Sequence, residues 1–518
     1  MGMNQPRNAV WVIAVLAALG GCAVGPTFTT PQASVASAWR PQNDPRVASQ
    51  ATADAAWWRT FGDPTLDRLV ELAYQQNLPL QISGLRIVEA RAQLGIASGR
   101  QWPQLQMLLG SATWNGLSKN TPVGGVLPHR NYGDYQLGFD AAWEIDLWGK
   151  YRRGVEAQSA ALLGSVADYA ASLVSLTAEV ARTYVAIRTY EVLIAEARAN
   201  EKVQAEGLEI AQARYTNGAT SELDPSQATT LLQSTRASIP QLQASLQQAR
   251  NALCTLLGQP VGAVDGLLGG AAGIPKTAAK VAVGVPAEML RRRPDIRSAE
   301  LAAAAQCARI GMAKAELFPS FSLFGTIGLE TTTVGGTTHS LFSTNSIFYT
   351  AGPRFTFPFF NYGRLTNAVR VEDARFQELL VNYRETVLRA AQEVEDALAG
   401  FLQAQEALAF EQGAVKAAAR SVELSLVMYR EGAADYTRVL DAQRALLDQQ
   451  NNLTQTASSV ATNLIALYKA LGGGWELRDG QPFVPATTQD EMRARTNWGD
   501  VLSEPRKPET KQNQTPAP

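Results

Sequence analysis

Residues 428–447 read MYREGAADYTRVLDAQRALL, and residues 214–232 read RYTNGATSELDPSQATTLL. Each stretch has a tyrosine, a glycine three residues later, and then acidic residues before an apolar helical pattern. The tyrosines, Tyr215 and Tyr429, are 214 residues apart, and the glycines share this offset. Because glycine supplies the backbone freedom that a tight turn needs, we predict a helix–turn–helix tip at each stretch.

The same offset continues along the chain and links Gly149 with Gly363, Glu179 with Glu393, and Leu257 with Leu471. A repeat of this length exceeds the roughly 20–50 residues of a solenoid repeat. It indicates a duplicated, domain-sized unit, which we place at 57–265 and 285–475. Around these units we expect an extended N-terminal segment over 22–56, a linker in the equatorial region over 266–284, and a flexible polar tail over 476–518.

Each unit contains a pair of alternating apolar stretches, which we expect to be strands over about 103–115 and 134–148, and over about 319–333 and 346–360. These lengths suit tilted membrane strands. Aromatic residues crowd their ends, as in the girdles of membrane barrels; they include Trp102, Trp114, Trp148, Phe318, Tyr349 and Tyr362. The hairpins of a soluble β-sandwich are the alternative that this pattern alone leaves open.

A helix of moderate length is expected before each strand pair, over 65–99 and 286–316, and two long helices after it. Seven-residue ladders of mostly apolar residues run through the long helices, for example Leu380, Val387, Val394, Phe401 and Leu408. Such a period predicts helices that coil around each other. The first long helix of each pair should have about 55–60 residues and span about 80–90 Å. Pro240 should bend or locally break the helix that contains it.

Four strands cannot close a barrel, and an open sheet in lipid would leave unpaired backbone groups at its edges. Several chains must therefore pool their strands, and three chains would supply twelve. The predicted fold is mainly α with a membrane β-barrel, which pooled strands of several chains would close and which an α-helical tube would continue.

The N-terminus resembles a bacterial lipoprotein signal peptide over residues 1–21. Arg7 precedes a short apolar run, and Leu19, Gly20 and Gly21 stand before Cys22 as in a lipobox. Cys22 would then become the mature N-terminus and carry covalent lipid. Because Ala23 follows, and not the aspartate often used for inner-membrane retention, we expect a lipid anchor in the outer membrane. An ordinary signal peptide with a chance cysteine is the alternative.

Composition argues against several classes of function. Lys+Arg 46 against Asp+Glu 47 gives a formal charge of −1, which indicates no nucleic-acid surface. With 2 histidines and 3 scattered cysteines, we expect no metal, no cofactor and no enzyme site. Cys254 and Cys307 are interpreted as packing thiols. The basic run 291–294 (RRRP) is interpreted as a solvated patch, and no membrane-spanning helix is expected after residue 22.

The duplicated plan, together with LRRRPDIRSAE (290–300), KAELFPSFSL (314–323), DLWGK (146–150) and YREG…VLDAQ (429–443), resembles the outer membrane factor family. These are TolC- and OprM-like channels, here of the lipidated NodT-type branch. The resemblance implies a homotrimer with a trimeric twelve-stranded β-barrel in outer-membrane lipid, continued by a periplasmic α-helical barrel. It also implies docking to a periplasmic adaptor and an inner-membrane pump, often of the RND type. It implies efflux of small molecules, as in multidrug resistance. The exit duct of a type I secretion system, exporting a polypeptide, is the alternative function.

The resemblance also implies a gate at the periplasmic tips, which would turn at Gly218 and Gly432. Asp441 matches an aspartate whose symmetry copies constrict the pore. Asp224 matches an aspartate of the first tip, and Tyr429 matches the tyrosine that hydrogen-bonds it. The chain departs from the family pattern because Ala434 stands where related channels carry an arginine, and Arg438 where they are acidic.

We therefore expect closed-state contacts that involve Asp435 and Arg438 instead. For Asp224 and Asp435 the alternative is helix capping, since both lie near helix N-termini. Asp441 lies too deep in its helix for a cap, which favours the pore role.

Overall fold

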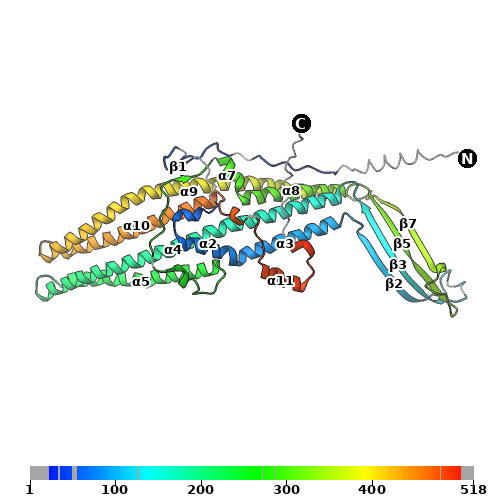
Figure 1. Cartoon of the computed structure of the whole chain (residues 1–518), viewed down its shortest axis with the longest axis horizontal. Helices are drawn as coiled ribbons and strands as arrows, with labels where there is room; N and C mark the ends of the chain where they lie inside the picture. Colours follow the sequence, from blue (N-terminus) through cyan, green and yellow to red (C-terminus); the bar gives the residue numbers. More distant parts are fainter. Residues whose placement is uncertain are drawn as a thin grey trace, which may run out of the picture. The chain divides into compact units, whose positions relative to one another are not determined.

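The computed structural model describes residues 23–502 except 33–34, 42, 49–54, 124, 127, 271, 285 and 479 (Figure 1). The predicted signal peptide, Cys22 and residues 503–518 lie outside the described residues. The chain forms two compact units: 1–31, 88–164 and 299–382 make unit 1, and 32–87, 165–298 and 383–518 make unit 2. Each unit draws on both sequence repeats, because every repeat supplies both strands and long helices.

The sheet of unit 1 is antiparallel with the order β2–β3–β5–β7, and it curves as one layer in Figure 1. Its strands are β2 (Leu105–Gly116), β3 (Asn131–Ile145), β5 (Ser320–Val334) and β7 (Ile347–Thr356), with the short β6 (Thr337–Thr338) beside β5. The expected strand pairs are confirmed. Within the described chain β2 and β7 each pair with one neighbour, so both edges of the sheet are open.

Large apolar side chains of this sheet are exposed: Leu108 is 75% exposed and Tyr349 80%. A soluble monomer rarely presents such a surface over whole strands. The sheet therefore needs a further partner, which in a membrane is lipid on one face and neighbouring strands at the edges.

Matching glycines join the strands to the long helices. Gly149 follows β3 with φ 78°, and Gly363 follows β7 with φ 78°. Beside the first junction, the Trp148 ring stacks on Phe318 with centroids 4.6 Å apart, and its Nε1 donates to the Pro319 carbonyl at 2.7 Å. A Cβ atom at position 149 would lie 2.8 Å from the Ala23 Cα, which is too close. The N-terminal segment can therefore pack here only because residue 149 is glycine.

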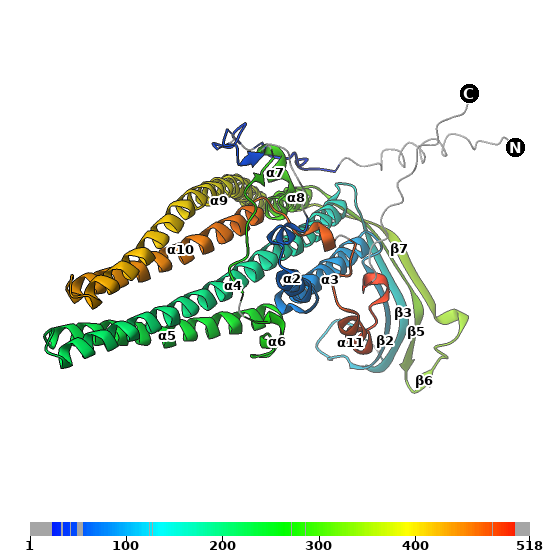
Figure 2. The ribbon, with the colours of Figure 1, turned by 60° about the vertical axis from the view of Figure 1, so that its left-hand side comes forward.

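The helices of unit 2 form two antiparallel hairpins, α4 (Lys150–Thr216) with α5 (Leu223–Leu256) and α9 (Arg364–Arg430) with α10 (Tyr436–Ala470) (Figure 2). The seven-residue ladders lie largely in the core; fully buried members include Val180, Ile187, Val394, Phe401, Val439 and Leu467. The expected length was too short, since α4 and α9 each have 67 residues and run through both units.

A further expectation about helices is wrong. The moderate helices are each divided, into α2 (Pro64–Gln76) with α3 (Leu78–Gly99), and α7 (Pro286–Arg292) with α8 (Pro294–Ala315). Asn77 breaks the first by capping α3 through Leu80 N, and the ring of Pro294 restricts the residue before it in the second. By contrast, α5 does not break at Pro240, an exposed position where the carbonyl left without its N–H partner can face water.

α4 has a stretch long and apolar enough to cross a membrane by length and composition alone, contrary to the expectation of none. Its apolar residues instead pack inside unit 2: Leu173, Val180, Tyr184 and Ile187 are buried. Core helices of soluble proteins also meet this criterion of length and composition, so it does not by itself indicate a membrane span.

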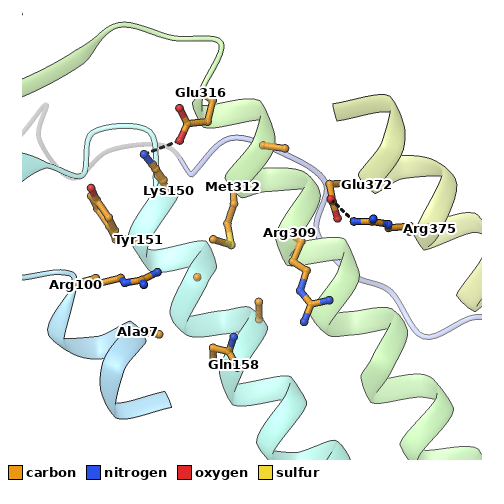
Figure 3. A pocket seen from close by; sticks show the side chains of 13 residues that line it. Ala97, Arg100, Lys150, Tyr151, Gln158, Arg309, Met312, Glu316, Glu372 and Arg375 are labelled. Atoms are coloured by element: carbon orange, nitrogen blue, oxygen red, sulfur yellow. Dashed lines mark hydrogen bonds and ion pairs between the residues drawn. The ribbon is translucent and has the colours of Figure 1, made fainter. Parts of the chain in front are cut away.

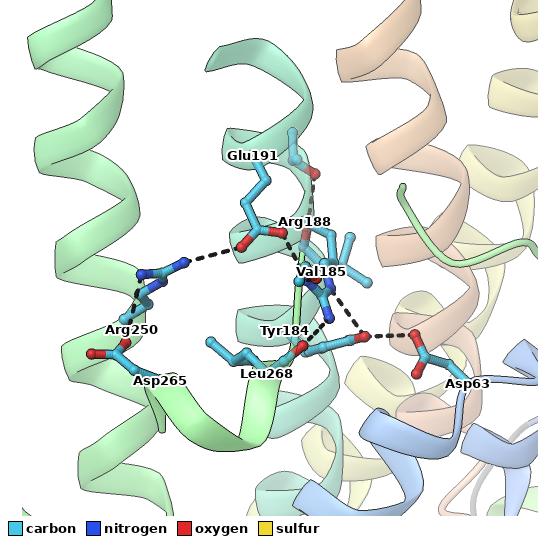
Figure 4. A network of polar contacts seen from close by, with 10 residues as sticks. Asp63, Tyr184, Val185, Arg188, Glu191, Arg250, Asp265 and Leu268 are labelled. Carbon is cyan, nitrogen blue, oxygen red and sulfur yellow. Dashed lines mark hydrogen bonds and ion pairs between the residues drawn. The ribbon is translucent and has the colours of Figure 1, made fainter. Parts of the chain in front are cut away.

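A buried ionic network fastens α4 to the segments around it (Figure 4). Arg188, 2% exposed, donates to Glu191 at 2.7 Å, to the Leu268 carbonyl at 2.7 Å and to the Tyr184 hydroxyl at 3.1 Å. Tyr184 donates to Asp63 at 2.6 Å, and Asp63 also caps α2. Because each buried charge has partners, the network holds α2, α4 and the short α6 (Asp265–Leu268) in one arrangement.

The basic run 291–294 and the C-terminal segment also differ from expectation. Arg291 and Arg292 are exposed, but Arg293 is 7% exposed and bonds Asp295, Glu393 and the Ala470 carbonyl. The expected tail is folded as far as residue 502: it carries α11 (Ala486–Arg495), and Phe483 meets Tyr169 edge-on at 5.1 Å. A few aromatic and apolar residues pack this segment against the rest of unit 2, although its overall composition is polar.

Candidate functional site at the helical turns

The turns between α4 and α5 and between α9 and α10 have the same backbone. Gly218 N–H bonds the Tyr215 carbonyl at 2.9 Å, and Ala219 N–H bonds the Arg214 carbonyl at 2.8 Å. Gly432 and Ala433 make the equivalent bonds at 3.0 and 2.8 Å. This is the Schellman arrangement, which requires a residue with positive φ after the helix. Gly218 (φ 71°) and Gly432 (φ 76°) meet that requirement, as predicted.

A small apolar core beside the turns joins the two hairpins within unit 2. Its buried members are Ala211, Ala228, Leu231, Tyr429, Tyr436, Val439 and Leu440. The rings of Tyr429 and Tyr436 meet edge-on with centroids 5.1 Å apart. The two turns are therefore held against each other by packing as well as by the polar contacts described next.

Tyr429 and Asp224 form a hydrogen bond between the hairpins. The Tyr429 hydroxyl donates to Asp224 Oδ2 at 2.8 Å, and the Thr220 hydroxyl donates to the same oxygen at 2.5 Å. Burial, followed by the bond to Asp224, raises the pKa of Tyr429 above its usual value, so the hydroxyl keeps its proton and remains a donor. The bond is charge-assisted, which makes it one of the stronger kinds of hydrogen bond in proteins.

Arg214 is a member of this site that the sequence interpretation missed. Its Nη1 donates to the Tyr429 carbonyl at 2.5 Å and to the Arg430 carbonyl at 3.3 Å, and its Cζ lies 4.8 Å from the Tyr429 ring centroid. A cation at these last carbonyls of α9 also interacts favourably with the helix dipole. The sequence shows that Arg214 is a basic residue near the end of a predicted helix. It does not show the bond to the Tyr429 carbonyl, because Tyr429 lies 215 residues further along the chain.

Beside the tyrosines, several buried polar atoms have no hydrogen-bond partner within the described chain. They are Tyr436 OH, both side-chain polar atoms of Gln204 and both of Gln443. Burial, with a further contribution from the Asp224 charge, raises the pKa of Tyr436 to about 12. Buried polar groups without partners are costly, so these side chains add little to the contact between the hairpins.

The remaining predicted residues lie apart from the Tyr429–Asp224 bond. Asp435 caps α10, accepting from Arg438 N–H at 3.4 Å, as the capping alternative anticipated. Arg438 and Asp441 are exposed, three residues apart on the α10 face opposite buried Tyr436 and Leu440. Among the described residues, neither Arg438 nor Asp441 has a side-chain ion-pair partner, so the expected Asp435–Arg438 contact is a backbone cap.

The two repeats carry different chemistry at equivalent places. Tyr429 is 1% exposed and bonds Asp224, whereas its counterpart Tyr215 is 44% exposed. No group of three or more metal-binding side chains occurs among the described residues. The site therefore offers contacts between helices and an exposed charged face.

Comparison with known proteins agrees with this arrangement. The family model described as outer membrane efflux protein matches residues 69–259 and 285–473. Nodulation protein T of Rhizobium leguminosarum bv. trifolii is 30% identical over 88% of this chain and 95% of its own. The probable efflux pump outer membrane protein TtgC of Pseudomonas putida is 31% identical over 89% of this chain and 95% of its own.

Solved structures give the same result. The outer-membrane channel OprN superposes with a TM-score of 0.81 at 32% identity, covering 88% of this chain and all of its own. The open-state MtrE outer membrane channel of Neisseria gonorrhoeae superposes with a TM-score of 0.75 at 28% identity, over 88% of this chain and 99% of its own. With its duplicated strands and helices matched along nearly their whole length, this chain belongs to the family of outer membrane efflux proteins, which are transport channels and not enzymes.

Proposed function

We propose that the chain is the outer-membrane channel of a tripartite efflux system and acts as a homotrimer. The observation that carries this proposal is the pair of open sheet edges at β2 and β7, together with the exposed apolar residues between them. Because unpaired backbone groups in lipid cost several kcal/mol each, strands of neighbouring chains would have to pair there. Three chains would give the twelve-stranded barrel, continued by the long helices as a tube in the periplasm.

The partners of this channel would be a periplasmic adaptor and an inner-membrane pump of the RND type. The exposed helix surfaces near the turns would meet the adaptor. Relatives are named for pyoverdine export, cation efflux and toluene efflux, which are chemically unlike cargoes. This variety supports the proposal that the pump selects the small molecule and that the channel conducts it.

The gate would lie at the helical turns. The Tyr429–Asp224 bond, with Arg214 on the last carbonyls of α9, would hold the two hairpins of one chain together in the closed state. Asp441, exposed on α10, would face its symmetry copies and bind cations at the narrowest point of the pore. Opening would separate the hairpins at the buried layer that lacks hydrogen-bond partners.

A lipid on Cys22 would anchor the trimer. Ala23, the first described residue, lies against Gly149 at the end of β3, and Val24 N–H bonds the Trp148 carbonyl at 3.0 Å. The mature chain would thus begin at the junction of strands and helices, where Trp148 and Phe318 suit the membrane interface.

The oligomer is tested on the full chain, expressed with its signal peptide. We expect it in the outer-membrane fraction, with the mass of a trimer in mild detergent and with ion conductance in planar bilayers. A monomeric protein recovered in the water-soluble fraction would overturn the channel function.

Replacing Tyr429 with Phe removes the hydroxyl that bonds Asp224. A hydrogen bond to a charged group contributes about 1.5–3 kcal/mol, so the closed contact weakens and the mean single-channel conductance should rise. Tyr215→Phe is the matched control, because that tyrosine is 44% exposed in the equivalent turn. Equal conductance of the two variants and the wild type would contradict the closing role of this bond.

Replacing Asp441 with Asn removes one carboxylate per chain from the proposed constriction. We expect divalent cations to lose their block of the current, measured in planar bilayers, because neutral amides attract cations less strongly. Asp448→Asn, one heptad further along the exposed side of α10, should retain the block. Unchanged block in Asp441→Asn would place the constriction elsewhere.

Lipidation is tested by mass spectrometry of the mature N-terminal peptide. We expect the peptide to begin at Cys22 and to carry acyl mass, and Cys22→Ser to lose that mass and the cleavage that precedes it. A mature N-terminus without acyl mass would exclude the anchor while leaving the barrel untouched.

A further inference from the structure

Unit 1 contains a cavity of about 550 Å³ among α3, α4, α8 and α9 (Figure 3). Its apolar lining consists of the Tyr151 ring, Met312 and four small residues, namely Ala97, Gly154, Ala157 and Ala313. Its volume lies in the range of sites that hold a small organic molecule. The cavity is separate from both the strands and the helical turns, so neither the barrel nor the gate accounts for it.

The charged residues around this cavity are not balanced. Lys150 pairs with Glu316 at 2.6 Å, and Arg375 pairs with Glu372 at 2.8 Å. Arg309 Nη1 donates to the neutral amide of Gln306 at 3.2 Å, and the Arg100 side chain is exposed at the cavity. Within the described residues neither Arg100 nor Arg309 has an ion-pair partner. Two guanidinium groups are therefore available to a ligand.

The N-terminal segment contacts one side of α8, and the cavity is lined by the other side. Residues 23–31 follow one side: a side chain at Gly311 would meet the Val24 carbonyl at 2.8 Å, Cys307 Sγ lies 3.6 Å from the Pro26 carbonyl, and Thr30 donates to Glu300 at 2.8 Å. The cavity is lined by Arg309, Met312 and Glu316. At about 100° per residue these two sets lie roughly half a turn apart.

From these two sides of α8 we can infer whether the cavity opens to the interior or the exterior of the channel, an inference that rests on the proposed function. An acyl chain on Cys22 must enter the bilayer outside the barrel, so the side of α8 that carries the N-terminal segment would face outward. The cavity on the other side would then open toward the water-filled interior of the channel, just below the barrel.

We propose that this cavity is a binding site for amphiphilic organic anions: carboxylates, sulfonates or phosphate esters with an apolar body of one or two rings. The body lies on the alanines and Met312, where its apolar surface leaves water. Arg100 and Arg309 border the cavity on opposite sides (Figure 3), and either can bind the anionic group, since guanidinium donors match the geometry of carboxylate, sulfonate and phosphate oxygens. Such a site would hold anionic cargo on its way through the channel.

The test uses 1-naphthalenesulfonate as the probe and the purified full chain in detergent, with the affinity measured by calorimetry. We expect wild type to bind it more tightly than 1-naphthylmethylammonium, which has a similar body and the opposite charge. Arg100→Gln combined with Arg309→Gln should weaken sulfonate binding about tenfold or more. The matched control is Arg384→Gln with Arg420→Gln, two exposed arginines of α9 outside the cavity.

Equal affinity for both probes, or an equal effect of the two double variants, would overturn the anion site. Detergent mass confirms that each variant retains the oligomeric state of the wild type. Conductance of the same preparations separates this proposal from the channel function. Conductance without charge-selective binding overturns the site alone, and charge-selective binding without conductance supports the site while overturning the channel.

Discussion

A backbone N–H or C=O group in hydrocarbon must find its hydrogen-bond partner within the protein, and most of this structure follows from that requirement. The chain supplies β2, β3, β5 and β7 to one sheet, and within the described residues β2 and β7 are its open edges. A single copy would therefore leave these edges unpaired in a membrane. Gly149 and Gly363 follow strands β3 and β7 and lead the chain into the long helices. The ladders of apolar residues on these helices also require partners, but for a different reason: their side chains must be buried away from water.

Features governed by local rules could be predicted from the sequence. The alternating residues placed the strands, the seven-residue ladders placed the long helices, and Gly218 and Gly432 placed the turns, because each signal reflects the backbone of its own segment. The Tyr429–Asp224 bond was anticipated as well, but from resemblance and not from any pattern in the residues.

Features that depend on distant partners could not be predicted. Arg214 acts on carbonyls at the end of another helix, and Arg293 is buried because Asp295, Glu393 and the Ala470 carbonyl surround it. In the sequence each of these arginines has polar neighbours. A solvent-exposed arginine has similar neighbours, so the sequence alone does not distinguish a buried arginine from a solvated one. Residues 476–502 were misjudged for a similar reason, since a few residues such as Phe483 and Val484 are enough to attach a polar segment to the core.

The duplication produced turns with the same backbone bonds but different side chains, and this difference has a mechanical consequence. In the ring of chains that we propose, the joints between hairpins would alternate: one kind would lie inside a chain and the other between neighbours. The Tyr429–Asp224 bond fastens the first kind, while the exposed Arg438 and Asp441 are left to the second or to the pore. In the ring that we propose, joints of two kinds would not all loosen together, so a modest force at the rim would act in steps, with the bonded joint inside each chain as one step and the joint between neighbours as the other.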